Sequence, residues 1–240
     1  MKGQMYDVAV DFIKTSNILE INLKQAPILS ADLLKYFYYA GVCYIAVDDY
    51  PNALASLLQC MCTPSLALSA VVIAAAKKAR LVAMIHYGRD FTISASIPGA
   101  VQKYLKKPMP AYDSLASAYL KSNPNNLETV LLAEREILNK DNNYGLAQRL
   151  LPAWTKHCCI RLSKTFISLS LNEIMKRLYM KDIQSTEEFI LKLVKKNEIS
   201  IKINPVDGIV TFDSEFNQNN HSFFMNNSTT STTTMNMNNK

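Results

Sequence analysis

The sequence predicts a mainly α-helical protein, in which a TPR-like array of α-helical hairpins is followed by a winged-helix module. Apolar residues recur at spacings of three and four over most of residues 1–183, and many of these segments begin near a proline or a helix-capping residue. Two short runs of alternating apolar residues then follow. We expect a helical repeat array over 1–143, the winged-helix part with its leading helix over 144–215, and a disordered Asn/Thr-rich tail over 216–240.

The clearest hairpin is predicted over residues 30–62. Its first helix, 30–47, has apolar residues every three or four positions, and Pro51 suits the first turn of a second helix over 51–62. Two helices joined by a short turn pack antiparallel. Because Ala40 and Gly41 are small, the second helix is expected to approach the first closely at that point.

Further helices extend the pattern toward the middle of the chain. Their predicted ranges are 65–86, 98–107, 110–121, 124–139 and 144–167. Gly88 is expected to end the first of them. Pro152 lies inside the last and predicts a kink or a junction between two helices, since proline lacks an amide N–H and crowds the preceding turn.

The segment after residue 168 has a different pattern. Ser170 with Glu173 has the spacing of a capping box at the start of a short helix, and Ser185 with Glu188 repeats that signal for a second helix. Two predicted strands then form a hairpin; their ranges are 199–203 and 208–212. Two helices followed by a hairpin are typical of a winged helix.

Composition limits the function classes. The net charge of +6 and the pI of about 9.0 permit an acidic partner but do not require one. The five cysteines are an odd number without the spacing of a secreted disulfide framework, which favours a reducing, intracellular compartment. The most apolar window, 66–76, is too short for a bilayer-spanning helix of about 20 residues.

No motif indicates catalysis, a cofactor or a metal site. The sequence lacks a nucleophile elbow, a phosphate-binding glycine loop, an H-x-H pair and a C-x-x-C pair. His157, Cys158 and Cys159 are consecutive, so on a helix their side chains point in different directions and do not converge on one ion. We interpret Asp48 and Asp49 as a turn between helices rather than an acid/base pair.

Nucleic-acid binding is the main alternative, because winged helices often place their second helix in the major groove of DNA. Residues 185–212 carry four lysines and four acidic residues, which is a poor match to phosphates. Positive charge is concentrated over 156–182 instead. The candidate basic surface comprises Lys156, Arg161, Lys164, Lys176, Arg177 and Lys181. A solvated face, an acidic protein partner and nucleic acid remain alternatives for it.

Residues 161–213 resemble the PCI domain, which scaffold subunits of the proteasome lid, the signalosome and a translation initiation complex share. The run RLSKTFISLSLNEIMKRLYMKDIQSTEEFILKLVKKNEISIKINPVDGIVTFD carries this resemblance, with Gly208 at the turn and Glu198-Ile199 at the strand start. The upstream run LLKYFYYAGVCYIAVDDYPNALASLLQCMCTPSLALSAVVIAAAKKARLVAMI is similar to the family of third subunits of the COP signalosome.

This resemblance implies a non-catalytic scaffold subunit, in the cytoplasm and nucleus, of the complex that removes NEDD8 from cullins. In that family a different subunit carries the isopeptidase metal site. The expected partners are other PCI-domain subunits, with no small-molecule substrate and no membrane; a scaffold of the proteasome lid or of a translation initiation complex is the alternative. Pairing of exposed sheet edges is the implied mode of contact. The candidate contact residues are Ile199, Ile201, Ile203, Ile209, Val210 and Phe212, although several must also face the core of their own domain.

Overall fold

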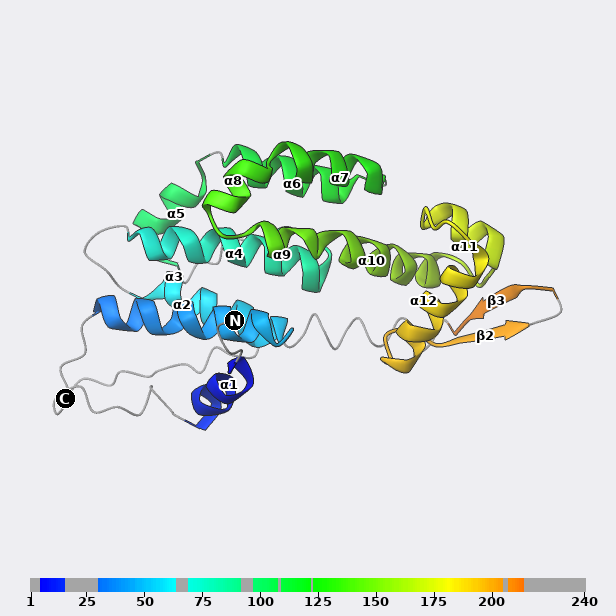
Figure 1. The fold of residues 1–240 in the computed structure, drawn as a ribbon, viewed down its shortest axis with the longest axis horizontal. Helices are drawn as coiled ribbons and strands as arrows, with labels where there is room; N and C mark the ends of the chain where they lie inside the picture. The colour runs from blue at the N-terminus through cyan, green and yellow to red at the C-terminus, as the bar shows by residue number, and fades with distance from the viewer. Residues whose placement is uncertain are drawn as a thin grey trace. The chain divides into compact units, whose positions relative to one another are not determined.

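A computed structural model describes most of the chain. The described residues are 5–15, 30–63, 69–91, 97–107, 109–121, 123–204 and 207–213. They are mainly helical with a small sheet near the end, which confirms the predicted fold class (Figure 1). The contacts divide the chain into two compact units, Met1–Trp154 and Thr155–Lys240. The predicted limits at 143 and 215 stay a prediction, and the predicted disordered tail, 216–240, lies outside the described residues.

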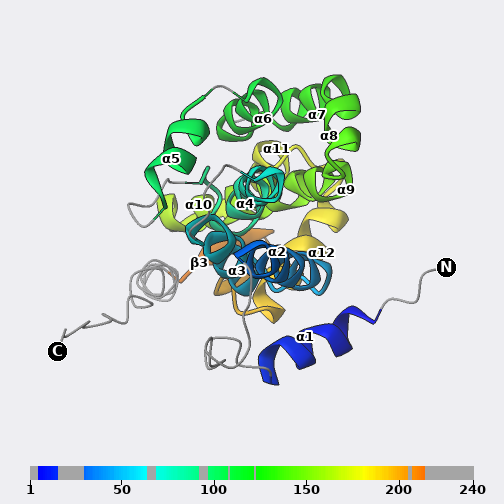
Figure 2. The ribbon, with the colours of Figure 1, turned by 90° about the vertical axis from the view of Figure 1, so that its left-hand side faces the viewer.

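The first unit contains a succession of helices. Their bounds are α1 (Tyr6–Thr15), α2 (Ser30–Ala46), α3 (Tyr50–Cys62), α4 (Ala70–Tyr87), α5 (Gly99–Leu105), α6 (Pro110–Leu120), α7 (Pro124–Ala133), α8 (Arg135–Lys140) and α9 (Tyr144–Gln148). The views in Figures 1 and 2 place α4 between the α2–α3 hairpin and α6. Each helix therefore buries its apolar side against neighbours, as in a hairpin array. Among the described helices, none is both long and apolar enough to span a bilayer.

The α2–α3 hairpin packs as closely as the sequence predicts. A Cβ atom added at Gly41 would lie 2.8 Å from Cγ of the fully buried Leu57, which is too close for two carbon atoms. The side chain of Asp49 caps α3 by accepting a hydrogen bond from the Asn52 amide, and Pro51 stands in the first turn. The capped turn and the close packing at Gly41 therefore both hold α2 against α3.

Two predicted long helices are each divided in two. Glu134 leaves helical geometry and separates α7 from α8, so the prediction of one helix over 124–139 is wrong. Arg149 separates α9 from α10 (Leu150–Thr165), three residues before Pro152, which confirms the predicted junction. Pro152 belongs to the first turn of α10, where its missing N–H costs little. Gly88 ends α4 in a left-handed conformation, as expected.

The second unit combines the end of α10 with a small αβ module. Its elements are β1 (Ser168–Ser170), α11 (Leu171–Arg177), α12 (Ile183–Lys195), β2 (Ile201–Asn204) and β3 (Ile209–Phe212). The antiparallel sheet has the order β1-β3-β2. The prediction of two helices and a hairpin is confirmed, whereas β1 is a third strand that the sequence analysis did not predict.

Apolar side chains from both helices and the sheet form the core of this module. The fully or nearly fully buried ones are Leu171, Ile174, Leu178, Ile190, Leu193, Ile199, Val210 and Phe212. Ser170 caps α11 by accepting a hydrogen bond from the Glu173 amide at 3.2 Å, as predicted. The predicted cap of the next helix is wrong: α12 begins two residues before Ser185, and Asp182 accepts a hydrogen bond from the Ser185 amide at 2.6 Å.

Four helix ends share one geometry. The left-handed residues are Asp48 after α2, Asn142 after α8, Tyr179 after α11 and Asn197 after α12, with φ between 53° and 61°. In each case its amide donates to the carbonyl three residues earlier, and the next amide donates to the carbonyl five residues before it. This pattern is the Schellman motif, in which glycine or asparagine is the usual left-handed residue.

Candidate protein-interaction surface

The strand order leaves β2 at an edge of the sheet. β3 pairs with β1 on one side and with β2 on the other. Among the described residues no strand pairs with the second side of β2. An unpaired edge presents backbone donors and acceptors in the pattern that another strand needs. We therefore treat the outer edge of β2 as the candidate interaction surface.

The direction of the backbone groups identifies which residues form this edge. The Phe212 amide donates to the Ile167 carbonyl on the β1 side at 2.8 Å, and the Asp213 amide donates to the Ser200 carbonyl on the β2 side at 3.0 Å. In an antiparallel ladder successive residues direct their N–H and C=O groups to opposite sides. Lys202, opposite Thr211, therefore bonds to β3, whereas the N–H and C=O groups of Ile201 and Ile203 point to the outer edge.

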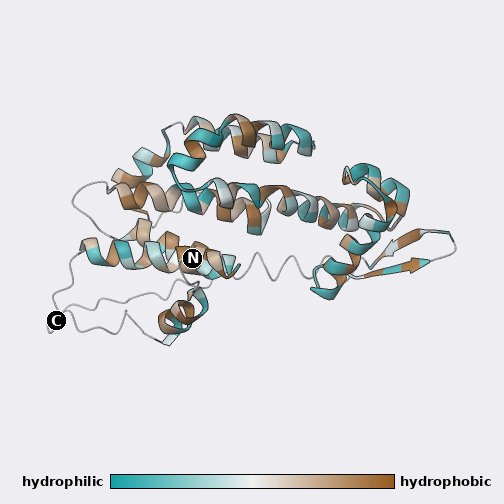
Figure 3. Cartoon of the chain, viewed as in Figure 1, coloured by the Kyte–Doolittle hydropathy of each residue, from teal (hydrophilic) through white to brown (hydrophobic). Residues whose placement is uncertain are grey.

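The side chains of β2 divide between two faces. Ile201 lies opposite Phe212 and Ile203 opposite Val210, so these half-buried side chains extend the inner face of the sheet. Lys202 and Asn204 are exposed on the other face. The alternation of hydrophobic and hydrophilic residues along β2 is visible in Figure 3. A partner strand aligned on this edge would have its register fixed by the alternation.

The six residues predicted to contact partners have different surroundings. Ile199, Val210 and Phe212 are buried inside the module, with exposed fractions of 1%, 0% and 4%. Ile201 and Ile203 are half-buried on the edge strand. Ile209 is exposed on the central strand, whose backbone is paired on both sides. A part in partner binding stays a prediction for all six.

The predicted basic surface is partly neutralised within the second unit. Lys156 forms an ion pair with Glu198 at 2.6 Å, and Arg177 forms one with Glu173 at 2.9 Å. The Arg161 guanidinium lies 2.9 Å from the Cys158 sulfur. Partial burial lowers the pKa of Lys164. The exposed Lys176 and Lys181 belong to none of the ion pairs found among the described residues. The role of the candidate basic surface in binding a partner stays a prediction.

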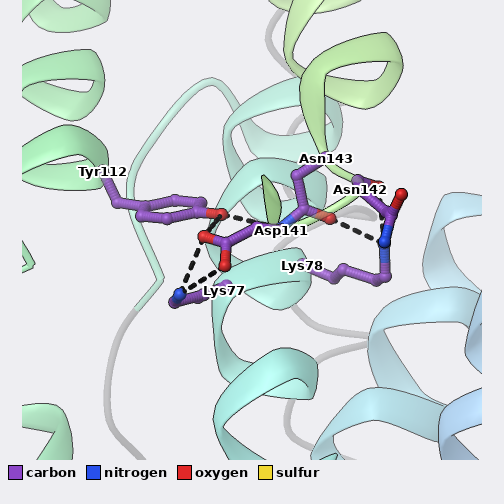
Figure 4. A network of polar contacts seen from close by, with 6 residues as sticks. All are labelled: Lys77, Lys78, Tyr112, Asp141, Asn142 and Asn143. Carbon is purple, nitrogen blue, oxygen red and sulfur yellow. Dashed lines mark hydrogen bonds and ion pairs between the residues drawn. The ribbon is translucent and has the colours of Figure 1, made fainter. Parts of the chain in front are cut away.

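A polar network inside the first unit was not predicted from the sequence (Figure 4). Lys77 donates to both Asp141 carboxylate oxygens at 2.7–2.8 Å, and Lys78 donates to Asn143 Oδ1 at 2.6 Å. The Tyr112 hydroxyl donates to Asp141 at 2.9 Å and accepts from Asn143 Nδ2 at 2.7 Å. The network joins α4, α6 and the turn between α8 and α9.

This network carries a structural role rather than a reactive one. Burial lowers the pKa of Lys78, while Asp141 opposes that shift. Burial raises the pKa of the Tyr112 hydroxyl, so it stays protonated and donates its hydrogen bond. Each member has a polar partner within hydrogen-bond distance, which is the condition for a stable buried network.

Two arginines form ion pairs between further parts of the first unit. Arg80 of α4 pairs with Asp90 and with Asp113 of α6, each at 2.6 Å. Arg149 donates to Asp48 and to the Ile45 carbonyl, and therefore links the α2–α3 turn to the end of α9. Asp48, interpreted above as part of a turn rather than of an acid/base pair, is accordingly one side of an ion pair.

The described residues contain no group of three or more His, Cys, Asp or Glu that could hold a metal ion. The cysteines are thiols at neutral pH: burial raises the pKa of Cys60 and that of Cys159 to about 12. A nucleophilic cysteine requires a lowered pKa instead. His221 lies outside the described residues.

Two protein families match the chain, and together they cover most of it. Residues 1–101 match the family described as COP9 signalosome complex subunit 3, N-terminal helical repeats, and residues 112–214 match the PCI domain. The second match starts in α6, so it includes the last helices of the first unit as well as the winged-helix module.

Curated relatives carry the same description. COP9 signalosome complex subunit 3 of Dictyostelium discoideum is 31% identical over 214 residues, which cover 89% of this chain and 51% of that protein. COP9 signalosome complex subunit 3 of Drosophila melanogaster is 33% identical over 194 residues, which cover 80% of this chain and 43% of that protein. The chain thus spans about half the length of the curated relatives it matches.

Proposed function

Because the chain belongs to the PCI-domain family, with repeats like those of COP9 signalosome subunit 3, we propose that it is a non-catalytic scaffold subunit of the COP9 signalosome. In this proposal it holds other PCI-domain subunits in place within the complex that deneddylates cullin-RING ubiquitin ligases. It works in the cytoplasm and nucleus. The matches to subunit 3 favour this complex over the proteasome lid and the translation initiation complex.

The outer edge of β2 is the single observation that carries the scaffold mechanism. Ile201 and Ile203 direct their backbone N–H and C=O groups away from β3. A strand of a neighbouring PCI subunit adds to this edge, and main-chain hydrogen bonds supply the contact. The half-buried Ile201 and Ile203 side chains extend the apolar face that the added strand continues. The helical array before the module supplies a second surface.

The chemistry of the described residues supports the non-catalytic part of the proposal. The carboxylates Asp48, Asp113 and Asp141 are held in ion pairs with basic side chains. Cys60 and Cys159 have raised pKa values because they are buried. In the proposed role these groups stabilise the fold. Another subunit of the complex carries out the isopeptidase reaction.

The Ile201→Pro variant tests the proposal. Proline is tolerated at the first residue of an edge strand, because the N–H it removes points away from the paired strand. It also places a ring where the partner strand must approach. We expect co-purification with other PCI-domain subunits of the complex to fall at least about tenfold, while the melting temperature of the isolated chain stays within a few degrees of the parent.

Ile201→Val is the matched control, because it keeps the amide and the β-branched side chain. It is expected to co-purify as the parent chain does. Unchanged assembly of Ile201→Pro, with its fold verified by circular dichroism, would contradict the proposed use of this edge. Failure of the parent chain to associate with any PCI subunit would contradict the scaffold function itself.

A further inference from the structure

Lys202 is the one charged residue of the edge strand β2, whose other residues are Ile201, Ile203 and Asn204. Its side chain is exposed on the outer face of the sheet, and it belongs to none of the ion pairs found among the described residues. The residue opposite it on β3 is the uncharged Thr211. The positive charge of Lys202 is therefore available to a strand that adds to this edge.

The acidic residues of the hairpin lie away from the open side of Lys202. Asp207, in the turn, accepts a hydrogen bond from Asn204 Nδ2 at 2.9 Å. Asp213 follows β3, and its amide donates to the Ser200 carbonyl on the paired side of β2. Two strand spacings, roughly 10 Å, separate β3 from a strand added on the other side of β2. Neither residue therefore occupies the position opposite Lys202 on the open edge.

The hydrogen-bond pattern of β2 decides which partner side chain comes closest to Lys202. Lys202 bonds to β3, whereas Ile201 and Ile203 present their backbone N–H and C=O groups to the open edge. An antiparallel strand that uses all these groups places its middle residue opposite Lys202 in a non-hydrogen-bonded pair. In such a pair the Cα atoms are only about 4.5 Å apart, so the two side chains are close neighbours.

The same geometry disfavours a second copy of this chain as the partner. If two β2 strands pair antiparallel through all the open backbone groups, Ile201 of one copy lies opposite Ile203 of the other. The two Lys202 side chains then lie opposite each other, and like charges in this position destabilise the pairing. A lysine on an edge strand commonly prevents self-pairing in this way. A carboxylate opposite Lys202 replaces the repulsion with attraction.

We propose that β2 selects a partner strand in which an acidic residue stands between two apolar residues, and that Lys202 determines this choice. The acidic side chain lies opposite Lys202 on the outer face. Its two apolar neighbours extend the inner face beside the half-buried Ile201 and Ile203. The inference deepens the proposed function and rests on it, because it names the chemistry of the strand that occupies the same edge. The described strands all pair antiparallel, which favours an antiparallel addition.

Charge reversal at Lys202 tests the inference in the assembled complex. Because Lys202→Glu sets like charges opposite each other, we expect co-purification with other PCI-domain subunits to fall about tenfold. Lys202→Arg keeps the charge and is expected to assemble as the parent does. Lys192→Glu is the matched control, since it makes the same charge change at an exposed lysine of α12 instead of the sheet. Circular dichroism verifies that each variant is folded.

Carbodiimide cross-linking of the parent complex identifies the residue opposite Lys202, because this reagent joins an amine to a carboxylate only where the two are in contact. We expect mass spectrometry to find Lys202 joined to an Asp or Glu that stands between two apolar residues of a neighbouring subunit. The inference is overturned if Lys202 is joined to no such residue, or if Lys202→Glu assembles as well as Lys192→Glu.

The outcomes separate this inference from the proposed function. If Ile201→Pro lowers assembly and Lys202→Glu does not, the edge is used without selection for an acidic residue, and only the inference fails. If the parent chain associates with no PCI-domain subunit, the scaffold function fails and the inference fails with it. Self-association of the isolated chain that Ile201→Pro abolishes would show that a second copy occupies the edge, which also overturns the inference.

Discussion

The helical array and the winged-helix module differ in how deeply they bury basic side chains. In the array, Lys78 is buried, and Lys77, Lys78, Arg80 and Arg149 each bond to another part of the same unit. In the module no described basic residue is buried: Lys156 and Arg177 form ion pairs, whereas Lys176 and Lys181 are exposed with no ion-pair partner among the described residues. A lysine therefore stabilises the interior of one unit, whereas the basic residues of the other stay at or near its surface.

Lys78→Ala, compared with Lys176→Ala, gives the largest expected difference. Loss of Lys78 leaves the Asn143 Oδ1 atom and the Asn142 carbonyl without this donor in a buried place. We expect a loss of about 2–4 kcal/mol in the free energy of unfolding. Lys176→Ala removes an exposed side chain and should change it by less than about 0.5 kcal/mol. Urea titration followed by circular dichroism measures both, and equal effects would refute the contrast between the units.

Gly41→Val, compared with Gly145→Ala, tests whether close packing holds the array. A Cβ atom at Gly41 meets Leu57 at 2.8 Å, whereas one at Gly145 meets nothing within 4 Å. Overpacking at Gly41 is expected to cost about 1–3 kcal/mol. Replacement of the unobstructed helical glycine is expected to stabilise by up to about 1 kcal/mol. Thermal melts of the two variants should therefore shift in opposite directions; a melting temperature that rises for Gly41→Val would contradict the packing.

Much of this architecture follows from local sequence. Ser170, Pro51, Gly88 and Pro152 act through the backbone of their own turn, so their positions predict helix starts, ends and a junction. β1 was missed because three residues with two serines have no apolar alternation. Ser185 was mistaken for the cap of α12 because Asp182, three residues earlier, satisfies the same rule.

Contacts between residues far apart in the sequence could not be predicted from local sequence patterns. Lys78 and Asn143 are 65 positions apart, and nothing in the sequence near either one indicates the other. The left-handed conformation of Tyr179 was likewise not predicted, since tyrosine is not a residue expected there. For the candidate interaction surface, the hairpin was predictable. Which of its strands has the open edge was not, because that depends on the unpredicted pairing of β1 with β3.

We expect a buried cysteine in each of the two units to be equally unreactive. Cys60 in the array and Cys159 in the module have pKa values raised by burial to about 12. Because the thiolate is the reactive form, both are expected to resist iodoacetamide at pH 8 in the native chain and to react after denaturation. Mass spectrometry of the alkylated peptides reads each site separately, with the half-buried Cys62 as the internal reference. Rapid native labelling of Cys159 would contradict its burial.

The smallest expected effect is a pH dependence confined to the module. Hydrogen bonds from Ser185 to Asp182 lower the pKa of this carboxyl below its usual value of 3.8. A lowered folded-state pKa contributes stability above the unfolded pKa, and this contribution is lost as the pH falls through the folded pKa. Stability should thus decline below pH 3.8 more steeply in the parent than in Asp182→Asn, which keeps a capping oxygen without the titrating group. Identical pH profiles in urea titrations would rule out this contribution.

Amide hydrogen exchange at Ile201 and Ile203 tests the scaffold mechanism most directly. In the isolated chain both amides point to the open edge of β2, so they should exchange quickly, whereas the Lys202 amide, bonded to β3, should be protected. After assembly with a neighbouring PCI-domain subunit, we predict that Ile201 and Ile203 become protected as well. Rapid exchange of these two amides in the assembled complex would contradict the pairing of this strand with a partner.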